Sequence, residues 1–189
     1  MDKKYNKLIL ITAPSGAGKT SIVKYLMTKF QQLAFSVSAT TRKARDNEKN
    51  GVDYYFISET EFRGKIHRKE FLEWEMVYEG KYYGTLKSEI ERIWSLQKVP
   101  VLDIDVQGAI HVQQQYPVNT MAVFIQAPST DELKRRLSGR GSETQESLQA
   151  RLDKSSYEMT FKNHFENVIT NKDFKTACMD AENIVSAFL

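Results

Sequence analysis

The segment APSGAGKTS, residues 13–21, combines glycines, a lysine and hydroxyl side chains at a spacing that binds phosphate. Gly16 and Gly18 let the backbone curl so that successive N–H groups point inward, and a helix that begins directly afterwards adds its positive end. Lys19 places a compact charge beside the terminal phosphates of a nucleotide, and Thr20 offers its hydroxyl to Mg²⁺. An ordinary turn with a solvated lysine is the alternative. The apolar runs LILIT before the segment and IVKYLM after it instead favour a strand, a phosphate-binding loop and a helix.

Two carboxylates end a second apolar strand, VPVLDID. The side chains of a strand alternate between its faces, so Asp103 and Asp105 share one face and Ile104 lies on the other. Burying unpaired carboxylates costs several kcal/mol or forces their protonation, so they are poor core residues. We therefore expect this strand end beside a metal ion or a substrate, as the acidic Mg²⁺ partner of a nucleotide-binding site.

Arginines and tyrosines in the first half of the chain could bind a second phosphate ester. Arg42 and Arg45 lie three apart in TTRKAR, and the segments DYYF and KYYGT add phenolic hydroxyls. Guanidinium forks and phenols together bind a phosphomonoester well, although basic residues in a loop are often only solvated. Glu73, in FLEWE, could be a surface carboxylate, but the flanking Leu72 and Trp74 suggest that the opposite face of the sheet is buried. The edge of a base is then a candidate partner for Glu73.

A third group of cations lies in the last third of the chain. Arg136 and Arg140 are four apart and share a helix face, and Arg151 adds a cation from the next helix. Phosphoryl transfer needs positive charge over the equatorial oxygens and exclusion of water, and a hinged lid that carries arginines supplies both. Exposed arginines paired with acids such as Glu132 are the alternative, which fits Arg135 better than Arg136 or Arg140.

Alternating strand-like and helix-like segments surround these residues and predict an α/β core with a parallel sheet and crossover helices. Residues 39–88 depart from this pattern and predict a small, partly antiparallel insertion with a binding surface of its own. Within them, Ser58 with Glu61 three residues later fits a capping box and predicts the start of a helix. Residues 129–151 contain two helix starts, STDE and SETQ, around a GRG hinge, and predict a lid. The strands expected in the core are LILITA, AFSVSA, VPVLDIDV, MAVFIQA and NVITN, and the first and last helices are expected at residues 19–30 and 174–188.

Composition sets broad limits on function. The chain has 189 residues, 41% of them hydrophobic, which suits one compact domain. A formal net charge of +3 is too small to indicate nucleic-acid or membrane binding, and no segment approaches the ~20 apolar residues needed to span a bilayer. The single cysteine, Cys178, rules out an internal disulfide and is expected to be a structural thiol. We therefore expect a cytoplasmic protein without nucleic-acid or membrane partners.

The motifs closely resemble those of the guanylate kinases, and the resemblance runs nearly end to end. It is carried by APSGAGKT, FSVSATTRKAR, NGVDYYF, FLEWEMVYEGKYYGT, LDIDVQGA, LKRRLSGRG and VITN. It implies the three-layer sandwich of the P-loop NTPases with a central parallel sheet, an inserted mixed α/β lobe that binds GMP, and a helical lid. The implied division of this single domain is a core at residues 1–38, 89–128 and 152–189, a GMP-binding lobe at 39–88 and a lid at 129–151. Three departures from the usual pattern are Ala13 in place of the first loop glycine, Ala44 in place of a frequent proline and Asn47 in place of a frequent glycine.

The resemblance also implies a role for each matching residue. The ATP-binding loop would consist of Ala13, Pro14, Ser15, Gly16, Ala17, Gly18, Lys19, Thr20 and Ser21. Mg²⁺ would be held by Thr20 and, through water, by Asp103. The GMP phosphate would be bound by Arg42, Arg45, Tyr54 and Tyr83, and guanine would be surrounded by Ser38, Glu73, Thr85 and Asp105. The residues implied in catalysis are Lys19, Arg42, Arg136, Arg140 and Arg151.

The implied reaction is ATP + GMP ⇌ ADP + GDP with Mg²⁺, by in-line transfer and without a covalent intermediate, and dGMP is an expected second acceptor. Guanine presents N1–H and its exocyclic amine side by side, a donor pair that matches the two oxygens of an ionised Glu73, whereas adenine offers an unprotonated N1. A kinase of ribose bisphosphates would not need Ser38, Glu73 and Thr85. A binding module without catalysis would not need Lys19 and Thr20 together with the lid arginines. The sequence leaves both a monomer and a homodimer open.

Overall fold

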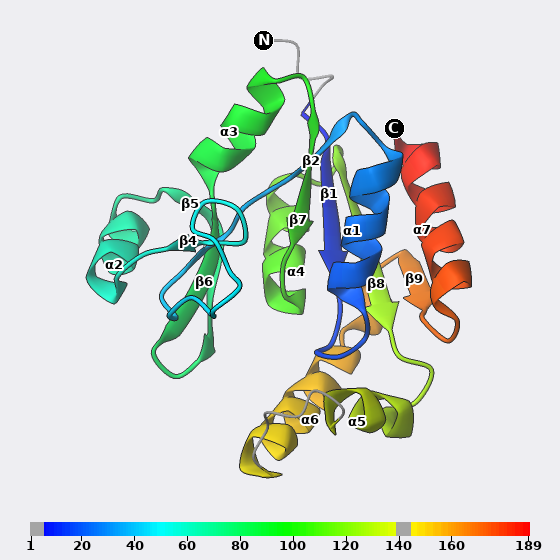
Figure 1. Cartoon of the computed structure of the whole chain (residues 1–189). Helices are drawn as coiled ribbons and strands as arrows, with labels where there is room; N and C mark the ends of the chain where they lie inside the picture. The colour runs from blue at the N-terminus through cyan, green and yellow to red at the C-terminus, as the bar shows by residue number, and fades with distance from the viewer. Residues whose placement is uncertain (1–5, 139–144) are drawn as a thin grey trace.

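A computed structural model describes residues 6–138 and 145–189, and its centre is a five-stranded parallel sheet (Figure 1). The central strand β1 is buried along its whole length, as expected for a parallel strand covered on both faces, whose sequence is a continuous apolar run. Ile9 pairs with Val101 on one side and with Met121 on the other, which sets the register of the sheet. The strand order is β2-β7-β1-β8-β9, with bounds β1 Leu8–Thr12, β2 Leu33–Phe35, β7 Val99–Asp103, β8 Thr120–Gln126 and β9 Asn167–Thr170.

Helices cover both faces of this sheet and complete three layers. Alternate side chains of β1 point to opposite faces, so Ile9 and Ile11 pack with α1 and α7, while Leu8 and Leu10 pack with α3 and α4. Cys178, on α7, is buried in the first of these two cores. The predicted α/β core is thereby confirmed. The helices are α1 Lys19–Lys29, α3 Lys87–Ser95, α4 Val106–Gln115 and α7 Phe174–Phe188, with a short 3-10 helix, η2 Lys162–His164, before β9.

The prediction of one strand over residues 34–39 is wrong, because the chain leaves the core sheet there. After β2, a separate strand, β3 (Ala39–Thr40), begins in the sheet of the inserted lobe. The N–H of Val37, between the two strands, donates to the side chain of Glu89 instead of to a neighbouring strand. Residues 36–38 connect the core sheet to the sheet of the lobe, and we call them the first crossing.

The inserted lobe has its own sheet in the order β4-β3-β6-β5, in which β5 and β6 are antiparallel and β3 and β4 are parallel. The packed side chains of Phe62, Phe71 and Tyr82 give it a separate small core. Ser58 caps α2 by accepting the N–H of Glu61 at 3.1 Å, as the capping-box spacing predicts. Figure 1 shows the lobe beside the core sheet, with α3 leading back from β6 to β7. The remaining bounds are β4 Tyr55–Phe56, α2 Glu59–His67, β5 Phe71–Tyr78 and β6 Lys81–Leu86.

Two helices, α5 (Thr130–Ser138) and α6 (Gln145–Met159), lie next to the carboxyl edge of the core sheet (Figure 1). Ser129 accepts the N–H of Glu132 at 3.1 Å, so the first predicted helix start of the lid is confirmed. The GRG hinge and most of the second helix start lie at residues 139–144, outside the described residues.

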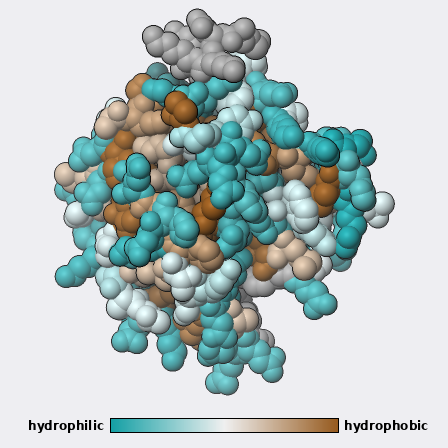
Figure 2. Space-filling view, turned by 180° about the vertical axis from the view of Figure 1, so that it is seen from behind, coloured by the Kyte–Doolittle hydropathy of each residue, from teal (hydrophilic) through white to brown (hydrophobic). Residues whose placement is uncertain are grey.

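The surface is mostly polar on the face seen from behind in Figure 2, where hydrophobic side chains form small groups between hydrophilic ones. Within residues 6–138 and 145–189, no helix is both long enough and apolar enough to cross a membrane.

Candidate active site

The phosphate-binding loop follows β1 and leads directly into α1, as the sequence predicts. Gly16 and Gly18 have φ angles of 89° and 101°, a left-handed conformation that glycine adopts without strain. Gly18 is the N-cap of α1, so the positive end of the helix points into the loop. The loop closes on itself through the N–H of Ala17, which donates to the carbonyl oxygen of Pro14 at 3.1 Å. This is a backbone arrangement suited to phosphate.

Asn171, directly after β9, supports the loop and is a residue whose role the sequence reasoning missed. It is buried, and its Nδ2 donates to the carbonyl oxygen of Ala17 at 2.8 Å. A Cβ on Gly18 would lie 2.3 Å from the same Nδ2, so a side chain at position 18 would displace the asparagine. The sequence signal for this residue is that it is polar and follows the carboxyl end of a buried parallel strand. All such strand ends meet at the edge of the sheet where the loop lies.

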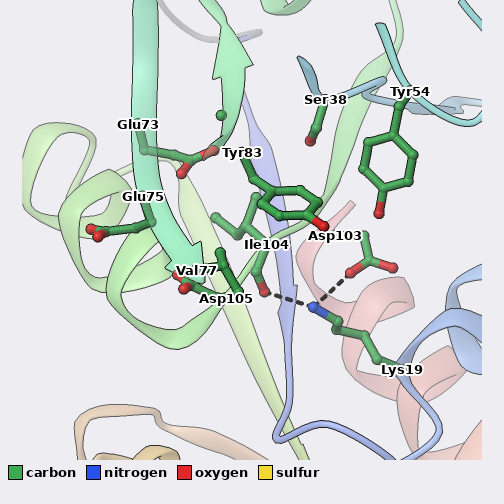
Figure 3. Close-up of a pocket in the computed structure, with 11 residues that line it drawn as sticks. Lys19, Ser38, Tyr54, Glu73, Glu75, Val77, Tyr83, Asp103, Ile104 and Asp105 are labelled. Atoms are coloured by element: carbon green, nitrogen blue, oxygen red, sulfur yellow. Dashed lines mark hydrogen bonds and ion pairs between the residues drawn. The ribbon is translucent and has the colours of Figure 1, made fainter. Parts of the chain in front are cut away.

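Lys19, the first residue of α1, extends toward the end of β7 (Figure 3). Its Nζ lies 2.6 Å from Oδ1 of Asp103 and donates to the carbonyl oxygen of Ile104 at 2.8 Å. Burial alone would lower the pKa of Lys19, but the charge and hydrogen bond of Asp103 outweigh burial, so the pKa is raised. The structure therefore holds a charged lysine beside the carboxylate pair that the strand pattern predicts.

A pocket of about 140 Å³ opens where the lobe faces the end of β7 (Figure 3). The predicted residues that line it are Lys19, Ser38, Tyr54, Glu73, Tyr83, Asp103 and Asp105. The other lining residues, which the sequence reasoning missed, are Glu75, Val77, Gly84 and Ile104. Side chains two apart on a strand share a face, so Glu75 and Val77 follow from Glu73 once β5 is known.

Glu73 is only 7% exposed, and its Oε1 has no hydrogen-bond partner in the described part of the chain. Burial raises the pKa of its carboxyl to about 7, and the nearby charge of Asp105 adds to the effect. Thr85, opposite Glu73 in the register of β5 and β6, is also buried, and its Oγ1 likewise lacks a partner among the described residues. A buried polar atom without a partner is costly unless a ligand satisfies it.

The predicted surroundings of Glu73 are partly wrong. Leu72 is buried as expected, but Trp74 is 40% exposed. The pairing of β5 with β6 shifts its register between Phe71 and Glu73, and such an irregularity breaks the simple alternation of side chains. Leu72 and Glu73 are therefore both buried at this point of β5, and only Trp74 departs from the expectation.

Arg42 is bound to Glu48, another residue that the sequence reasoning missed. Nη1 and Nη2 of Arg42 donate to the two carboxylate oxygens of Glu48 at 2.6 Å each, and the guanidinium lies 4.9 Å from the ring centre of Tyr54. The hydrogen bonds from Arg42 lower the pKa of Glu48 to about 2. Glu48 also accepts the backbone N–H of Arg45 at 2.9 Å. The side chain of Arg45 is exposed, and neither arginine is among the residues that line the pocket.

Two predicted lid arginines reach the phosphate-binding loop or its support. Arg136 donates to the carbonyl oxygen of Asn171 at 2.9 Å, and Arg151 donates from Nη2 to Oγ of Ser15 at 2.7 Å. Arg140 lies outside the described residues. The helices α5 and α6 therefore bring cations to the loop from a distant part of the sequence.

Ion pairing within the lid, the alternative weighed for its arginines, is also present. Glu132 accepts hydrogen bonds from Arg135 at 2.8 Å and from Arg136 at 2.7 Å. These bonds lower the pKa of Glu132 to about 2. Arg136 differs from Arg135 because it also bonds to Asn171, so its ion pair holds it in a position from which it reaches the loop support.

The oxygen atoms near Lys19 suit a magnesium ion that is shared with a nucleotide. Thr20 is exposed in the first turn of α1, and Asp103 ends β7. Among residues 6–138 and 145–189 there is no group of three or more His, Cys, Asp or Glu side chains that could hold a metal alone. Hydroxyl and carboxylate oxygens are the ligands that Mg²⁺ prefers, and this ion is usually bound by few protein groups together with substrate phosphates. The donor set therefore fits Mg²⁺.

Comparison with known proteins decides the family. The family model for guanylate kinase matches residues 5–188. The chain belongs to the guanylate kinase family. It is 44% identical to the guanylate kinase of Bacteroides fragilis over 97% of this chain and 90% of that protein, and 41% identical to that of Thermotoga maritima over 95% of this chain and 86% of that protein. The crystal structure of guanylate kinase from Anaplasma phagocytophilum matches with a TM-score of 0.76 at 28% identity, over 96% of this chain and 85% of that one.

Guanylate kinases are ATP:GMP phosphotransferases, and this chain is an enzyme of that kind. The resemblance inferred from the sequence motifs is confirmed. The match to guanylate kinases sets aside both alternatives, a ribose bisphosphate kinase and a binding module without catalysis. The parallel core with its phosphate-binding loop is the P-loop NTPase architecture that the motifs imply.

Proposed function

We propose that this guanylate kinase binds the guanine of GMP against Glu73 and phosphorylates GMP with ATP and Mg²⁺ held at the phosphate-binding loop. One observation carries the assignment: a buried carboxylate, with one oxygen that has no partner among the residues the structure describes, lines the same pocket as the loop lysine, Lys19. A carboxylate suited to hydrogen-bond donors and a cation suited to phosphates thus face one space. An acceptor nucleotide in that space would have its base at one end and its phosphate near the donor.

Guanine is the base that fits Glu73. Its N1–H and exocyclic amine form a pair of adjacent donors, which match the two oxygens of an ionised carboxylate. Adenine presents an acceptor at N1, so the buried carboxylate would keep its desolvation cost without regaining both hydrogen bonds. Ser38, Thr85 and Asp105 complete the proposed base site. Asp105 is already oriented, because its Oδ1 accepts the N–H of Gly108 at 2.9 Å as the N-cap of α4.

The GMP phosphate is assigned to Arg42, Arg45, Tyr54 and Tyr83. Tyr54 and Tyr83 line the pocket, with their rings 6.0 Å apart at a steep angle. Arg42 stacks on Tyr54, so its charge is close to the two phenols. Guanidinium and phenol groups donate hydrogen bonds to phosphate oxygens without needing to change protonation state.

The phosphate-binding loop, residues 13–21, is assigned to the phosphates of ATP. Its inward N–H groups and the N-terminus of α1 favour negative charge, and Lys19 adds a full positive charge. The Thr20 hydroxyl and, through water, the Asp103 carboxylate would hold Mg²⁺, which supplies neutralisation of charge on the phosphate oxygens. Lys19 is kept protonated and oriented by Asp103.

Catalysis is assigned to positioning and to charge stabilisation. Lys19, Arg42 and the lid arginines Arg136, Arg140 and Arg151 would surround the transferring phosphoryl group with positive charge. Because the attacking atom is a phosphate oxygen that is already ionised, the reaction needs no general base. Closure of the lid over the nucleotides would exclude water, which would otherwise compete as acceptor.

The proposal includes the organisation and setting of the enzyme. The core comprises residues 1–38, 89–128 and 152–189, the GMP-binding lobe residues 39–88 and the lid residues 129–151, although α6 continues past the lid boundary to Met159. We expect dGMP to be accepted along with GMP, and we place the enzyme in the cytoplasm as a monomer or homodimer.

A coupled assay of ADP release tests the proposal. GMP and dGMP should support turnover with ATP, whereas AMP, CMP and UMP should give little. Chelation with EDTA should stop the reaction, and added Mg²⁺ should restore it. Comparable rates with AMP and GMP would contradict the role of Glu73, and full activity in EDTA would contradict the role of Thr20 and Asp103.

A further inference from the structure

Glu89, on α3, is a buried carboxylate that lies outside the residues lining the pocket. It is 3% exposed, and an acidic side chain is almost never buried to this degree unless it is paired. Family membership and the proposed chemistry give it no task. A carboxylate in such a place indicates that its hydrogen bonds hold specific segments together.

The partners of Glu89 come from three segments of the chain. Its Oε1 accepts the backbone N–H of Val37 at 3.2 Å, and its Oε2 accepts the hydroxyl of Tyr55 at 3.3 Å. Arg92, one turn further along α3, donates to both oxygens at 2.8 and 2.9 Å. Burial alone would raise the pKa of Glu89, but the hydrogen bonds from Arg92 and Val37 outweigh it, so the pKa lies below its usual range. The carboxylate is therefore charged and fully engaged.

These partners lie where the lobe joins the core. Val37 belongs to the first crossing, residues 36–38, through which the chain leaves β2 for the lobe. The helix α3 forms the second crossing, because it connects β6 of the lobe with β7 of the core (Figure 1). Tyr55 is in β4 of the lobe. Glu89 thus ties the two crossings to each other and to a lobe strand.

The two segments that Glu89 holds also carry pocket residues. Ser38 directly follows Val37, and Tyr54 directly precedes Tyr55, and both Ser38 and Tyr54 line the pocket. The segments are joined to each other as well, because the N–H of Tyr55 donates to the carbonyl oxygen of Ser38 at 2.9 Å. A shift of either segment relative to α3 would therefore move a pocket side chain.

We propose that Glu89 is a positioning residue for the acceptor nucleotide: through Val37 and Tyr55 it sets where Ser38 and Tyr54 stand in the pocket. The inference rests on the proposed role of this pocket in binding GMP. In the part of the chain that the structure describes, the hydrogen bonds of Glu89 go to Val37, Tyr55 and Arg92 and not to the phosphate-binding loop, so we expect it to affect binding of the acceptor and not of ATP.

The substitution Glu89→Gln tests this role, with Glu91→Gln on the exposed side of the same helix as the matched control. The amide cannot accept from Val37, Tyr55 and Arg92 together, so the KM for GMP should rise roughly tenfold, as expected for the loss of a charge-assisted hydrogen bond. The KM for ATP should stay within about twofold of the wild-type value, since a general loosening of the fold would weaken the binding of both substrates. Glu91→Gln should change neither value.

Tyr55→Phe provides a milder test that preserves the helix and its ion pair. It removes only the hydroxyl that contacts Glu89, and the KM for GMP should rise roughly threefold. In the double variant the two effects should fall short of additivity, because both changes remove the same contact. An unchanged KM for GMP in Tyr55→Phe, or an equal rise in both KM values in a folded Glu89→Gln, would overturn the proposal.

Glu73→Gln measured in parallel separates this inference from the proposed function. If Glu73→Gln raises the KM for GMP and Glu89→Gln does not, the assignment of the pocket to GMP stands and the role proposed for Glu89 fails. If Glu73→Gln leaves the KM for GMP unchanged, the assignment of the pocket itself fails, whatever Glu89→Gln does.

Discussion

Replacing Glu73 with glutamine should make the protein more stable while it disables recognition of GMP. The side chain keeps its size, but it loses its negative charge and exchanges one acceptor oxygen for a donor amide. Glu73 is buried, and its Oε1 lacks a hydrogen-bond partner among the described residues. Such a carboxylate is costly to ionise in the folded protein, and glutamine removes that cost.

The size of the stability effect follows from the pKa. Burial raises the pKa of Glu73 to about 7 from an ordinary value of 4.5, a difference that corresponds to about 3 kcal/mol. Between these pH values the folded protein holds a proton that the unfolded chain has lost, so the free energy of unfolding falls as the pH rises. Glu73→Gln should therefore add up to about 3 kcal/mol to the free energy of unfolding at pH 8, or about 6 to 12 °C in Tm, and almost nothing at pH 4.5.

The effect on catalysis runs in the opposite direction. Losing one charge-assisted hydrogen bond and leaving a guanine donor opposite an amide donor should cost about 2 to 4 kcal/mol. This cost is roughly a 30- to 1000-fold loss in kcat/KM for GMP. AMP presents an acceptor at N1, so its kcat/KM should fall far less than that of GMP. The ratio of GMP to AMP activity should therefore fall, while the KM for ATP should barely change.

Thermal unfolding at several pH values and steady-state kinetics with GMP and AMP measure both effects. The GMP phosphate itself titrates near pH 6, with a second pKa of about 6, and this contribution is common to the wild type and the variant. Only the wild type should show an additional fall in kcat/KM for GMP below about pH 7. An unchanged GMP to AMP ratio would refute the role of Glu73 in reading the base. A destabilised variant at pH 8 would refute the reasoning from its burial.

Three further substitutions test the loop and the arginine site. Lys19→Ala should lower kcat by roughly 100-fold or more, because a preorganised charge is lost. Calorimetry should nevertheless show nearly normal GMP binding. A near-normal kcat would contradict the role assigned to Lys19. Gly18→Ala would place a Cβ 2.3 Å from Nδ2 of Asn171, at a residue whose φ is 101°. The KM for ATP should therefore rise, and the free energy of unfolding should fall by about 1 to 3 kcal/mol. Wild-type kinetics and a wild-type Tm would show that the loop tolerates the side chain. Glu48→Gln should raise the KM for GMP roughly fivefold to tenfold, because Arg42 loses the carboxylate to which its Nη1 and Nη2 both donate. A lower KM for GMP would mean instead that Glu48 competes with the GMP phosphate for Arg42.

The parts of the fold that were predictable from the sequence are those with strong local signals. The run LILIT has no polar interruption before Thr12, so a buried parallel strand was the natural prediction. The pair of glycines before Lys19 indicated the loop, and Ser58 indicated the start of α2. Each of these signals lies within a few residues of the feature it predicts.

The parts that were missed depend on contacts between distant segments. The break after β2 was invisible because AFSVSA is a good strand throughout, and its division arises from two different sheets and from the Glu89 contact to Val37. The Asn171 side chain meets Ala17 across 154 positions of sequence. Leu72 is buried and Trp74 is exposed, although they are two residues apart, and the register of β5 with β6 shifts between Phe71 and Glu73, which the β5 sequence alone does not reveal.

The acids that hold cations in this site share a physical origin, although Asp103 is predicted from the sequence and Glu48 is not. Lys19 and Arg42 have side chains that are only 21% and 12% exposed, and each is paired with a carboxylate at 2.6 Å, Asp103 and Glu48 respectively. A cation that is largely removed from water is costly unless it is paired and hydrogen-bonded. A site that must present several such cations to phosphates therefore needs acids around them, and these acids also fix the direction in which each cation points. Under the proposed assignment, the carboxylates near the pocket would contribute to phosphate binding as much as the lysine and arginines that would touch the phosphates.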